Sequence, residues 1–285
     1  MNPRVSNLSN LYIVGTPIGN LEDLTFRALK ILSKVNYIFS EDTRVSKKLL
    51  NNYKIDTKLI SIYKPNKKLN SEYFLELLNQ QDLAFTTDAG MPGISDPVGE
   101  FVKLARNKEH NIITIPGVSS LTSSFSVSGI ESKGFTFLGF LSKSTSQKIN
   151  ELTKALEVNL PIIIFESPKR IISTLEFLKH EFNIKNIFIG KELTKIFETI
   201  FYGDIDNAIN IFNNKKGEFV IIIEPEEITF SKSLIEKYDK ILIEGYEKGI
   251  KGKRLLNLIS DLSGTNKSLL YERWLEIKRN NGNKA

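Results

Sequence analysis

The chain has 285 residues, of which 41% are hydrophobic and 25% are charged, and its formal net charge is +6, as expected for a globular protein of about two domains. The absence of cysteine excludes disulfides and thiolate chemistry, and two scattered histidines, each expected alone at the surface, argue against a histidine metal site or a Ser-His-Asp triad. No apolar segment approaches the ~20 residues of a membrane span, and no signal-peptide core is seen, so we expect a cytoplasmic protein without a metal.

Strands and helices are predicted to alternate through a first domain, residues 1–130. Short apolar runs predict five strands, at 11–14, 37–39, 59–62, 83–86 and 112–115. Apolar residues at helical spacing predict helices after them, at 24–32, 45–51, 70–78, 98–105 and about 120–128. Such alternation favours an α/β fold with a parallel sheet covered by helices.

A second domain is predicted over residues 131–228, with fewer helices between its strands. The strands are expected at 135–141, 162–165, 187–190, 198–202 and 219–223, so a mixed sheet is favoured. From residue 229 to 285 the pattern predicts a helical extension, with helices at 234–246, 254–262 and 267–277. The polar turn at 263–266 is compatible with a helix-turn-helix, and equally with a plain helical appendage.

The stretch Thr86–Pro97 is the most unusual turn in the chain. It follows a predicted buried strand and holds two glycines, two prolines and two aspartates. Glycine-rich backbone at the carboxyl end of a parallel strand favours a ligand loop. The simpler interpretation is a strand-to-helix turn in which Asp96 caps the helix and Pro97 takes its first position. That interpretation leaves Asp88-Ala89-Gly90 unexplained.

Other strand ends carry similar turns, and together they predict a ligand cleft between the two domains. They are Gly15–Asn20, Ser40–Arg44, Pro116–Ser120, Glu166–Pro168, Lys191–Glu192 and the turn Lys216–Glu218 before the last strand. No P-loop is present, and Gly15–Gly19 lacks the third glycine of a dinucleotide loop. A carboxylate beside exposed N–H groups at Asp88-Ala89-Gly90 suits S-adenosylmethionine but also many other metabolites, so the residues alone leave the ligand open.

Basic residues concentrate between Arg44 and Lys68, where eight cations and one acid give a net charge of +7. Tyr53 and Tyr63 interleave with them and could stack on bases, which favours a nucleic-acid partner. An ordinary solvated face is the simpler alternative.

Several motifs occur in an order that resembles a known family. They are Leu11–Leu21, Glu41-Asp42-Thr43-Arg44, Asp88–Pro92, Asp96-Pro97, Pro116-Gly117, Gly139–Leu141, Phe165–Ser167, Glu192–Lys195, Glu198–Ile200 and Lys216–Glu218. From about residue 10 to 225 the chain is similar to the ribosomal RNA small subunit methyltransferase I family, within the tetrapyrrole (precorrin-like) methylase superfamily. The helical tail resembles the C-terminal extension of that family.

The resemblance implies a two-domain methylase fold, a homodimer, and S-adenosylmethionine in the interdomain cleft. It implies methyl transfer to the ribose 2′-hydroxyl of a decoding-centre cytidine in 16S ribosomal RNA, in free form or in the 30S subunit. The cofactor-binding residues that it implies are Pro17, Asp88, Ala89, Gly90, Met91, Ile94, Pro116, Gly117, Ser119, Ser120, Phe165 and Glu218.

A ribose hydroxyl is a poor nucleophile, so a general base is useful. The candidates are Glu41, Asp42, Glu166, Lys191 and Glu192, of which we favour Glu192 or Lys191 as catalytic residues. The alternative for Glu192 is a surface ion pair with Lys195, and that for Glu41 and Asp42 is helix capping.

RNA phosphate contacts are assigned to Arg44, Lys47 and Lys48. Two other functions stay open: methylation of a small tetrapyrrole-like molecule, and RNA binding without catalysis.

Overall fold

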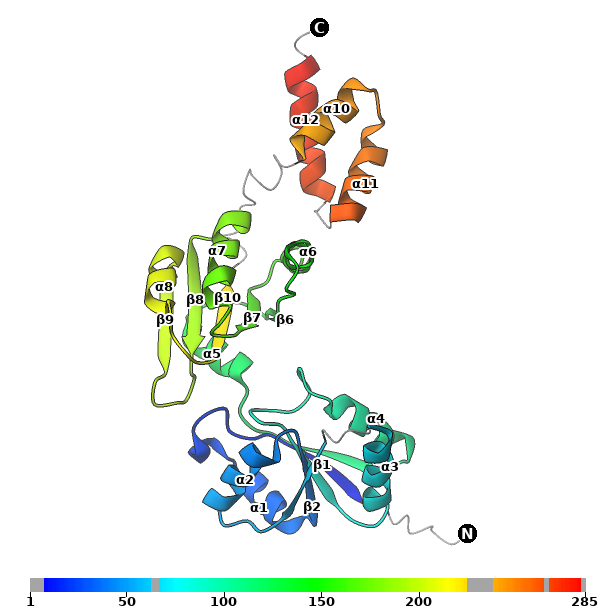
Figure 1. Cartoon of the computed structure of the whole chain (residues 1–285), viewed down its shortest axis with the longest axis vertical. Coiled ribbons are helices and arrows are strands. Elements are labelled where there is room, and N and C mark those ends of the chain that lie inside the picture. The colour runs from blue at the N-terminus through cyan, green and yellow to red at the C-terminus, as the bar shows by residue number, and fades with distance from the viewer. Residues whose placement is uncertain (1–7, 63–66, 225–237, 264–266, 283–285) are drawn as a thin grey trace. The chain divides into compact units, whose positions relative to one another are not determined.

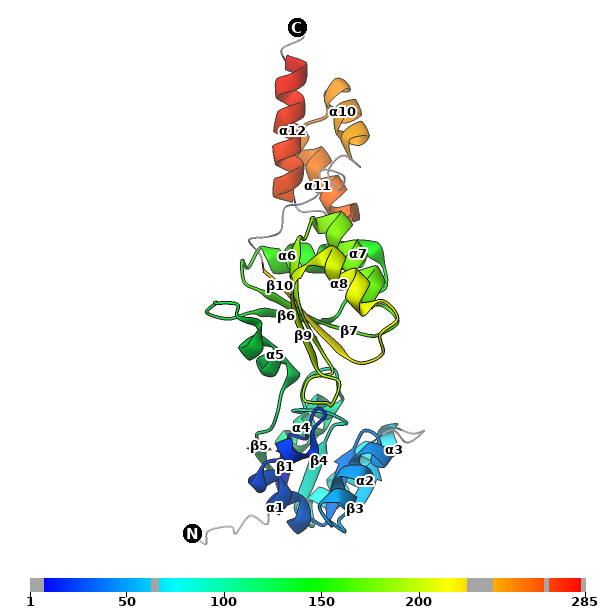
Figure 2. The same cartoon turned by 90° about the vertical axis from the view of Figure 1, so that its left-hand side faces the viewer.

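The computed structural model describes residues 8–62, 67–224, 238–263 and 267–282 (Figures 1 and 2). The contacts divide the chain into two units, one reaching Ser123 and including Leu193–Ile196, the other formed by Ser124–Glu192 and the residues from Phe197 onward. The domain boundaries expected at residues 130 and 228 stay a prediction. No helix in these ranges is both long enough and apolar enough to span a membrane.

The first unit contains the predicted parallel sheet. Its strands lie in the order β3-β2-β4-β1-β5, and all are parallel: β1 (Asn10–Val14), β2 (Tyr37–Ser40), β3 (Lys58–Ser61), β4 (Leu83–Thr86) and β5 (Asn111–Ile115). The helices that follow them are α1 (Phe26–Lys34), α2 (Thr43–Asn52), α3 (Lys67–Leu78), α4 (Val98–Asn107) and α5 (Ser120–Ser128), with a 3₁₀ turn η1 (Leu21–Asp23) before α1. The α/β fold expected from the alternation is therefore confirmed.

Helices cover both faces of this sheet (Figure 1). The connections from β1 to β2 and β3 run one way along the sheet, and those from β3 to β4 and β5 run back. Because crossovers are right-handed, the reversal places α1 and α2 on one face and α3 and α4 on the other. Alternate residues of β1 serve the two cores, since Leu11 and Ile13 pack with α3 and α4 while Tyr12 and Val14 pack with α1 and α2.

The surface position predicted for His110 is wrong. The residue is only 7% exposed, and its Nε2 lies 3.0 Å from Asn79 Oδ1. The physical reason is the end of α4, where Glu109 adopts a left-handed conformation (φ 61°) and the His110 N–H donates to Ala105. His180, in contrast, is exposed as predicted.

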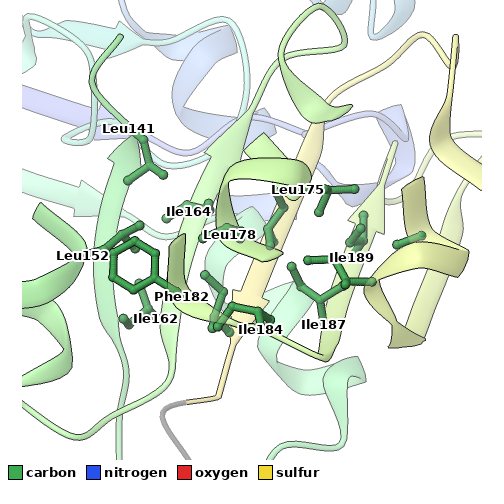
Figure 3. Close-up of a cluster of buried hydrophobic side chains, with 14 of the residues drawn as sticks. Leu141, Leu152, Ile162, Ile164, Leu175, Leu178, Phe182, Ile184, Ile187 and Ile189 are labelled. Atoms are coloured by element: carbon green, nitrogen blue, oxygen red, sulfur yellow. The ribbon is translucent and has the colours of Figure 1, made fainter. Parts of the chain in front are cut away.

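The second unit contains the predicted mixed sheet, in the order β6-β7-β10-β8-β9. β6 and β7 are parallel, and the other neighbours are antiparallel: β6 (Thr136–Phe140), β7 (Ile162–Glu166), β8 (Asn186–Lys191), β9 (Thr199–Asp204) and β10 (Phe219–Ile223). Its helices α6 (Thr145–Leu156), α7 (Ile171–Phe182) and α8 (Ile205–Phe212) share one apolar core with alternate strand residues (Figure 3).

The described part of the C-terminal extension contains the three predicted helices: α10 (Asp239–Glu247), α11 (Gly252–Ser263) and α12 (Lys267–Gly282). The first four residues of the helix expected at 234–246 lie outside the described residues. The three helices enclose a small core that includes Leu242, Leu256 and Trp274. The Arg273 guanidinium binds both carboxylate oxygens of Asp239, at 2.9 and 2.6 Å, and so ties α12 to α10. Most of the polar turn expected at 263–266 lies outside the described residues.

Phe74→Ala should destabilise the first unit by about 3–5 kcal/mol, because the fully buried ring packs on Phe39 and Phe101 with centroids 5.2 and 5.0 Å away. The matched control is Phe26→Ala, whose ring is 93% exposed, and its effect should stay within about 0.5 kcal/mol. Native-state hydrogen exchange of the β2 and β4 amides measures both. Equal losses in the two variants would contradict this core.

Candidate functional site

The chain leaves the neighbouring strands β1 and β4 in opposite directions. β1 leads through α1 toward β2, whereas β4 leads through α4 to β5 on the other side. The loops after β1 and β4 therefore lead to opposite faces of the sheet, which makes a topological switch point at the carboxyl edge, where open α/β sheets bind ligands. The predicted ligand loop and the Gly15–Asn20 turn both lie at this edge.

Backbone hydrogen bonds tie these two loops together. The Thr16 N–H donates to Gly90 at 3.0 Å, and the Gly90 N–H donates to Thr16 at 3.1 Å. The buried Thr16 hydroxyl adds contacts of 3.2 Å to the Thr87 carbonyl and 3.3 Å to the Gly90 carbonyl. Gly90 has φ +80°, a left-handed conformation that favours glycine. Sequence reasoning missed Thr16, because only the pairing of distant loops gives its hydroxyl a role.

The third loop, after β5, meets the first without room for a side chain. A Cβ on Gly117 would lie 2.8 Å from Gly15 Cα, and a Cβ on Gly15 would lie 2.7 Å from Gly117 Cα. The Gly15 N–H donates to Ile115 at 3.0 Å. Pro17 is buried and Pro116 exposed on either side of this contact. The switch point is thus lined by backbone.

Ser119 and Ser120 lie where this third loop turns into α5. Both are half-buried, and the Ser119 carbonyl accepts the Ser123 N–H at 2.9 Å. The two serines therefore belong to the first turn of the helix, close in sequence to the Gly15–Gly117 contact.

The predicted cofactor loop after β4 has an exposed start. Asp88 and Ala89 are exposed, Gly90 is buried, and Met91 is half-buried against the core shared with α3 and α4. Ile94 is 45% exposed. The loop therefore offers a carboxylate and backbone to solvent from a fixed base.

Asp96 holds the end of this loop. One carboxylate oxygen accepts the N–H groups of Gly93 and Ile94, at 2.6 and 3.0 Å, and the other accepts that of Val98 at 2.9 Å. Asp96 thus bonds the first residue of α4, as a capping side chain would, but from the position before the N-cap. Pro97 is the N-cap residue, one position before the predicted one, because α4 begins at Val98.

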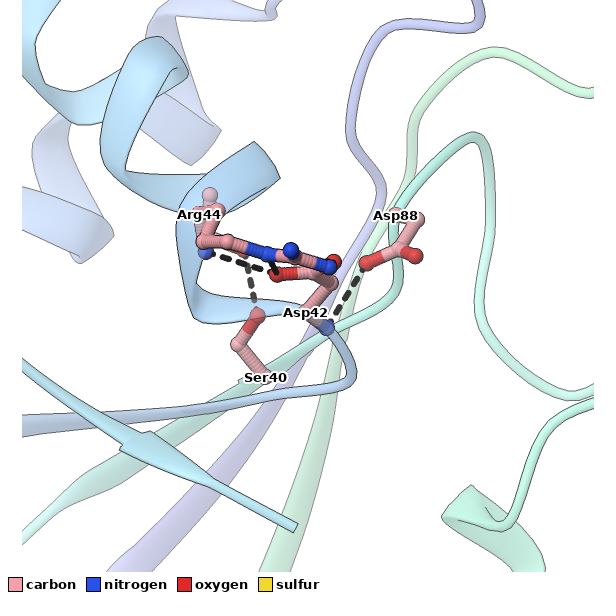
Figure 4. A network of polar contacts seen from close by, with 5 residues as sticks. Ser40, Asp42, Arg44 and Asp88 are labelled. Atoms are coloured by element: carbon pink, nitrogen blue, oxygen red, sulfur yellow. Dashed lines mark hydrogen bonds and ion pairs between the residues drawn. The ribbon is translucent and has the colours of Figure 1, made fainter. Parts of the chain in front are cut away.

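A hollow opens beside the start of this loop. Figure 4 shows the polar contacts of Asp42, Arg44 and Asp88, three of its lining residues. The volume of the hollow is about 440 Å³, and its lining is Glu41, Asp42, Thr43, Arg44, Ser61 and Asp88. Asp88 Oδ1 accepts the Asp42 N–H at 2.9 Å, so the cofactor loop is bonded to the residue that caps α2. The hollow therefore joins a predicted cofactor residue, Asp88, to a predicted RNA-binding residue, Arg44.

The Arg44 guanidinium is paired with Asp42. Its Nε lies 3.0 Å from Oδ1 and its Nη2 lies 2.6 Å from Oδ2, although the Arg44 side chain is 87% exposed. These hydrogen bonds, with that from the Arg44 N–H, lower the pKa of Asp42 from 3.8 to about 2. The Asp42 carboxylate therefore stays ionised beside the Arg44 guanidinium at neutral pH. Lys47 and Lys48 are exposed further along α2.

In the second unit, Glu192 and Glu218 bind each other at one edge of the mixed sheet. The Glu192 N–H donates to the Glu218 carbonyl at 2.9 Å, and the Glu218 N–H donates to Glu192 Oε1 at 2.9 Å. Gly217 allows this approach, since a Cβ there would lie 2.5 Å from Glu192 Cγ. Because β10 is antiparallel to β8, the turn before it reaches the carboxyl end of β8.

Lys191 and Phe165 are at the same edge of that sheet, since both Lys191 and Glu166 pair with Phe219. Lys191 is buried, and its Nζ lies 3.4 Å from the Phe197 carbonyl. Phe165 is half-buried and packs edge-on against Phe137.

Glu166, one of the candidate bases, is held inside the protein. It is 2% exposed, accepts the Ser167 N–H at 2.7 Å and the Thr174 hydroxyl at 2.7 Å, and lies 3.4 Å from Arg170. These contacts give its carboxylate a structural role. Across the described ranges, no three His, Asp or Glu side chains gather in a way that could hold a metal ion.

Comparison with curated proteins finds relatives that are named "Ribosomal RNA small subunit methyltransferase I". That of Mycoplasmopsis pulmonis is 44% identical over 218 residues, or 75% of this chain and 97% of the relative. That of Thermotoga maritima is 40% identical over 224 residues, or 77% and 100%. That of Halalkalibacterium halodurans is 34% identical over 272 residues, or 92% and 93%.

Solved structures with the same fold are more distant in sequence. A diphthine synthase has a TM-score of 0.62 and 12% identity, covering 76% of this chain and 90% of that one. A cobalt precorrin-4 methyltransferase has a TM-score of 0.58 and 17% identity, covering 78% and 97%. Residues 10–209 match the family model described as Tetrapyrrole (Corrin/Porphyrin) Methylases. The chain therefore belongs to the ribosomal RNA small subunit methyltransferase I family of the tetrapyrrole methylases.

Proposed function

We propose that this protein transfers a methyl group from S-adenosylmethionine to the ribose 2′-hydroxyl of a decoding-centre cytidine in 16S ribosomal RNA. Methylases of its family depend on this cofactor. Small-subunit ribosomal RNA appears in the name of its relatives, which supports RNA over a small ring as the acceptor.

The switch point of the first sheet suits this cofactor. Bound S-adenosylmethionine supplies a methyl group already activated by its sulfonium. The Gly15–Gly117 contact and the left-handed Gly90 leave backbone where side chains would fill the edge, and Asp88 adds an exposed carboxylate. We assign Pro17, Ala89, Met91, Ile94, Pro116, Ser119 and Ser120 to the same site. We also assign a role in cofactor binding to Phe165 and Glu218 of the second unit.

One observation carries the RNA assignment: Asp88 and Arg44 line the same hollow. The carboxylate that we assign to the cofactor and the guanidinium that we assign to RNA phosphate are thus linked through Asp42. An exposed ion pair is worth little in free energy, so a phosphate can replace Asp42 as the partner of Arg44. Lys47 and Lys48 extend this positive surface along α2.

For catalysis we assign Glu192 as the proton acceptor of the ribose hydroxyl and Lys191 as its positioning partner. The reciprocal bonds with Glu218 fix the Glu192 backbone and one carboxylate oxygen. The buried Lys191 ammonium holds the Phe197 carbonyl in the chain segment that follows. Such fixed groups accelerate a reaction chiefly by orientation.

We propose that the protein acts in the cytoplasm as a homodimer.

The direct test is incubation of the protein with small ribosomal subunits, free 16S ribosomal RNA and labelled S-adenosylmethionine, followed by mass mapping of the product. A single 2′-O-methylated cytidine in the decoding region is the expected result. A methyl group on a base would overturn the proposal. So would a parallel incubation with a tetrapyrrole in which only the tetrapyrrole becomes labelled.

Asp88→Ala should lose about 1.5–3 kcal/mol of cofactor affinity, roughly 10- to 100-fold in Kd, because a charged hydrogen-bond partner is removed. Asp88→Asn is the matched control. Its side-chain oxygen can still accept the Asp42 N–H, so the start of α2 should stay in place while the negative charge is lost. Titration calorimetry with S-adenosylmethionine measures both. Unchanged affinity in Asp88→Ala would remove this residue from the site.

Replacing Arg44, Lys47 and Lys48 by glutamine should weaken RNA binding and lower the slope of log K against log salt by about 2–3, since each lost phosphate contact removes about 0.7–0.9. The control carries glutamine at Lys103, Arg106 and Lys108, exposed cations at the far end of α4. Anisotropy titrations of labelled RNA at several salt concentrations give the slopes. Equal slopes for the two variants would return the α2 cations to ordinary surface.

A further inference from the structure

Exposed cations gather where α10 ends and α11 begins, in the connecting turn and the first residues of α11. We call residues 248–254 the basic turn; its cations are Lys248, Lys251, Lys253 and Arg254. Lys248 lies 3.9 Å from Glu244 on the preceding turn of α10. Within the described ranges the other three cations form no salt bridge, and Glu247 is the nearest further acid in the sequence.

Helix stability does not explain these cations. The positive end of a helix dipole lies at its N-terminus, where acidic side chains stabilise and basic ones destabilise. The first turn of α11 has no acidic residue and carries Lys253 and Arg254, directly after Lys251. The charges therefore work against the helix that bears them, which favours a role in binding.

The basic turn is also held in one conformation. A Cβ on Gly252 would lie 2.5 Å from Trp274 Nε1, and one on Gly245 would overlap Leu255, so two glycines let three helices approach closely. Tyr246 packs edge-on against Trp274 with ring centroids 5.8 Å apart. The cations thus project from a packed base, so binding has little backbone entropy to remove.

The helical extension lies beyond the part of the chain that matches the family model. The match to the family model ends at residue 209, before α10 begins at Asp239. Relatives from M. pulmonis and T. maritima are covered almost completely by only three quarters of this chain. An activity common to the family does not require the extension, so its cations serve an additional purpose.

We propose that the basic turn binds the phosphate backbone of the RNA substrate away from the methylated nucleotide. It adds affinity and takes no part in the chemistry. The identity of the partner as RNA rests on the proposed function, whereas the site itself rests on charge, exposure and rigidity. Lys251, Lys253 and Arg254, for which the described residues provide no salt bridge, suit neighbouring phosphates, which position a protein on RNA without reading its sequence.

The test uses the full chain with glutamine at Lys251, Lys253 and Arg254, beside the control at Lys103, Arg106 and Lys108, which removes the same charge elsewhere. The probe is a labelled hairpin RNA from the decoding region. We expect the first variant to bind it at least ~10-fold more weakly, with a salt slope smaller by about 2–3, and the control to bind like the wild type. Cofactor affinity and the rate at saturating RNA should not change.

Trp274 provides an independent signal, because it is the only tryptophan in the chain and packs beneath Gly252. RNA should change its emission in the wild type and leave it unchanged in the glutamine variant. An unchanged salt slope, a fall in Tm of the variant, or poly-glutamate binding as tight as RNA would overturn the inference, the last in favour of an acidic protein. A wild type that binds RNA through this turn but methylates none would overturn only the proposed function.

Discussion

The contact between the backbones of Gly15 and Gly117 constrains the whole carboxyl edge of the first sheet. At Cβ distances of 2.7–2.8 Å no side chain fits at either position, and the neighbouring Thr16–Gly90 bridge holds the loop after β4 to the same backbone. Asp88 lies two residues before Gly90 in the same loop. Its carboxylate accepts the Asp42 N–H and so connects the bridge to the start of α2. A displacement of the first contact would therefore reach Arg44 through a continuous series of hydrogen bonds.

Charge is arranged differently in the two units. In the first, Asp42, Arg44 and Asp88 line an open hollow, where water weakens the Asp42–Arg44 pair. In the second, Glu166 is buried among three polar residues, Ser167, Arg170 and Thr174, and serves the fold. Glu192 is instead held by hydrogen bonds with the Glu218 backbone. The antiparallel direction of β10 makes this possible, since it brings the turn at Gly217 to the end of β8.

Much of the fold could be predicted from sequence because strand and helix periodicities are local. The apolar runs at 11–14 and 83–86 and the α/β alternation identified the parallel sheet, and the scarcity of helices after residue 131 identified the mixed one. The loop at Asp88-Ala89-Gly90 could be found for a related reason: glycine and proline at a strand end have few structural uses. Pro97 was misplaced by one position, since the hydrogen bond from Val98 to Asp96 is compatible with either start of α4.

The sequence by itself therefore determined the two sheets, the helical extension and the family, all of which depend on patterns within a few residues or on motifs in order. Tertiary structure alone decided that His110 and Glu166 are buried. It also decided that Thr16 pairs with Gly90 and that the Arg44 guanidinium binds the Asp42 carboxylate. The physical reason is that burial and pairing depend on which distant segments meet. That choice follows from strand order and crossover direction, which no single stretch of the chain encodes.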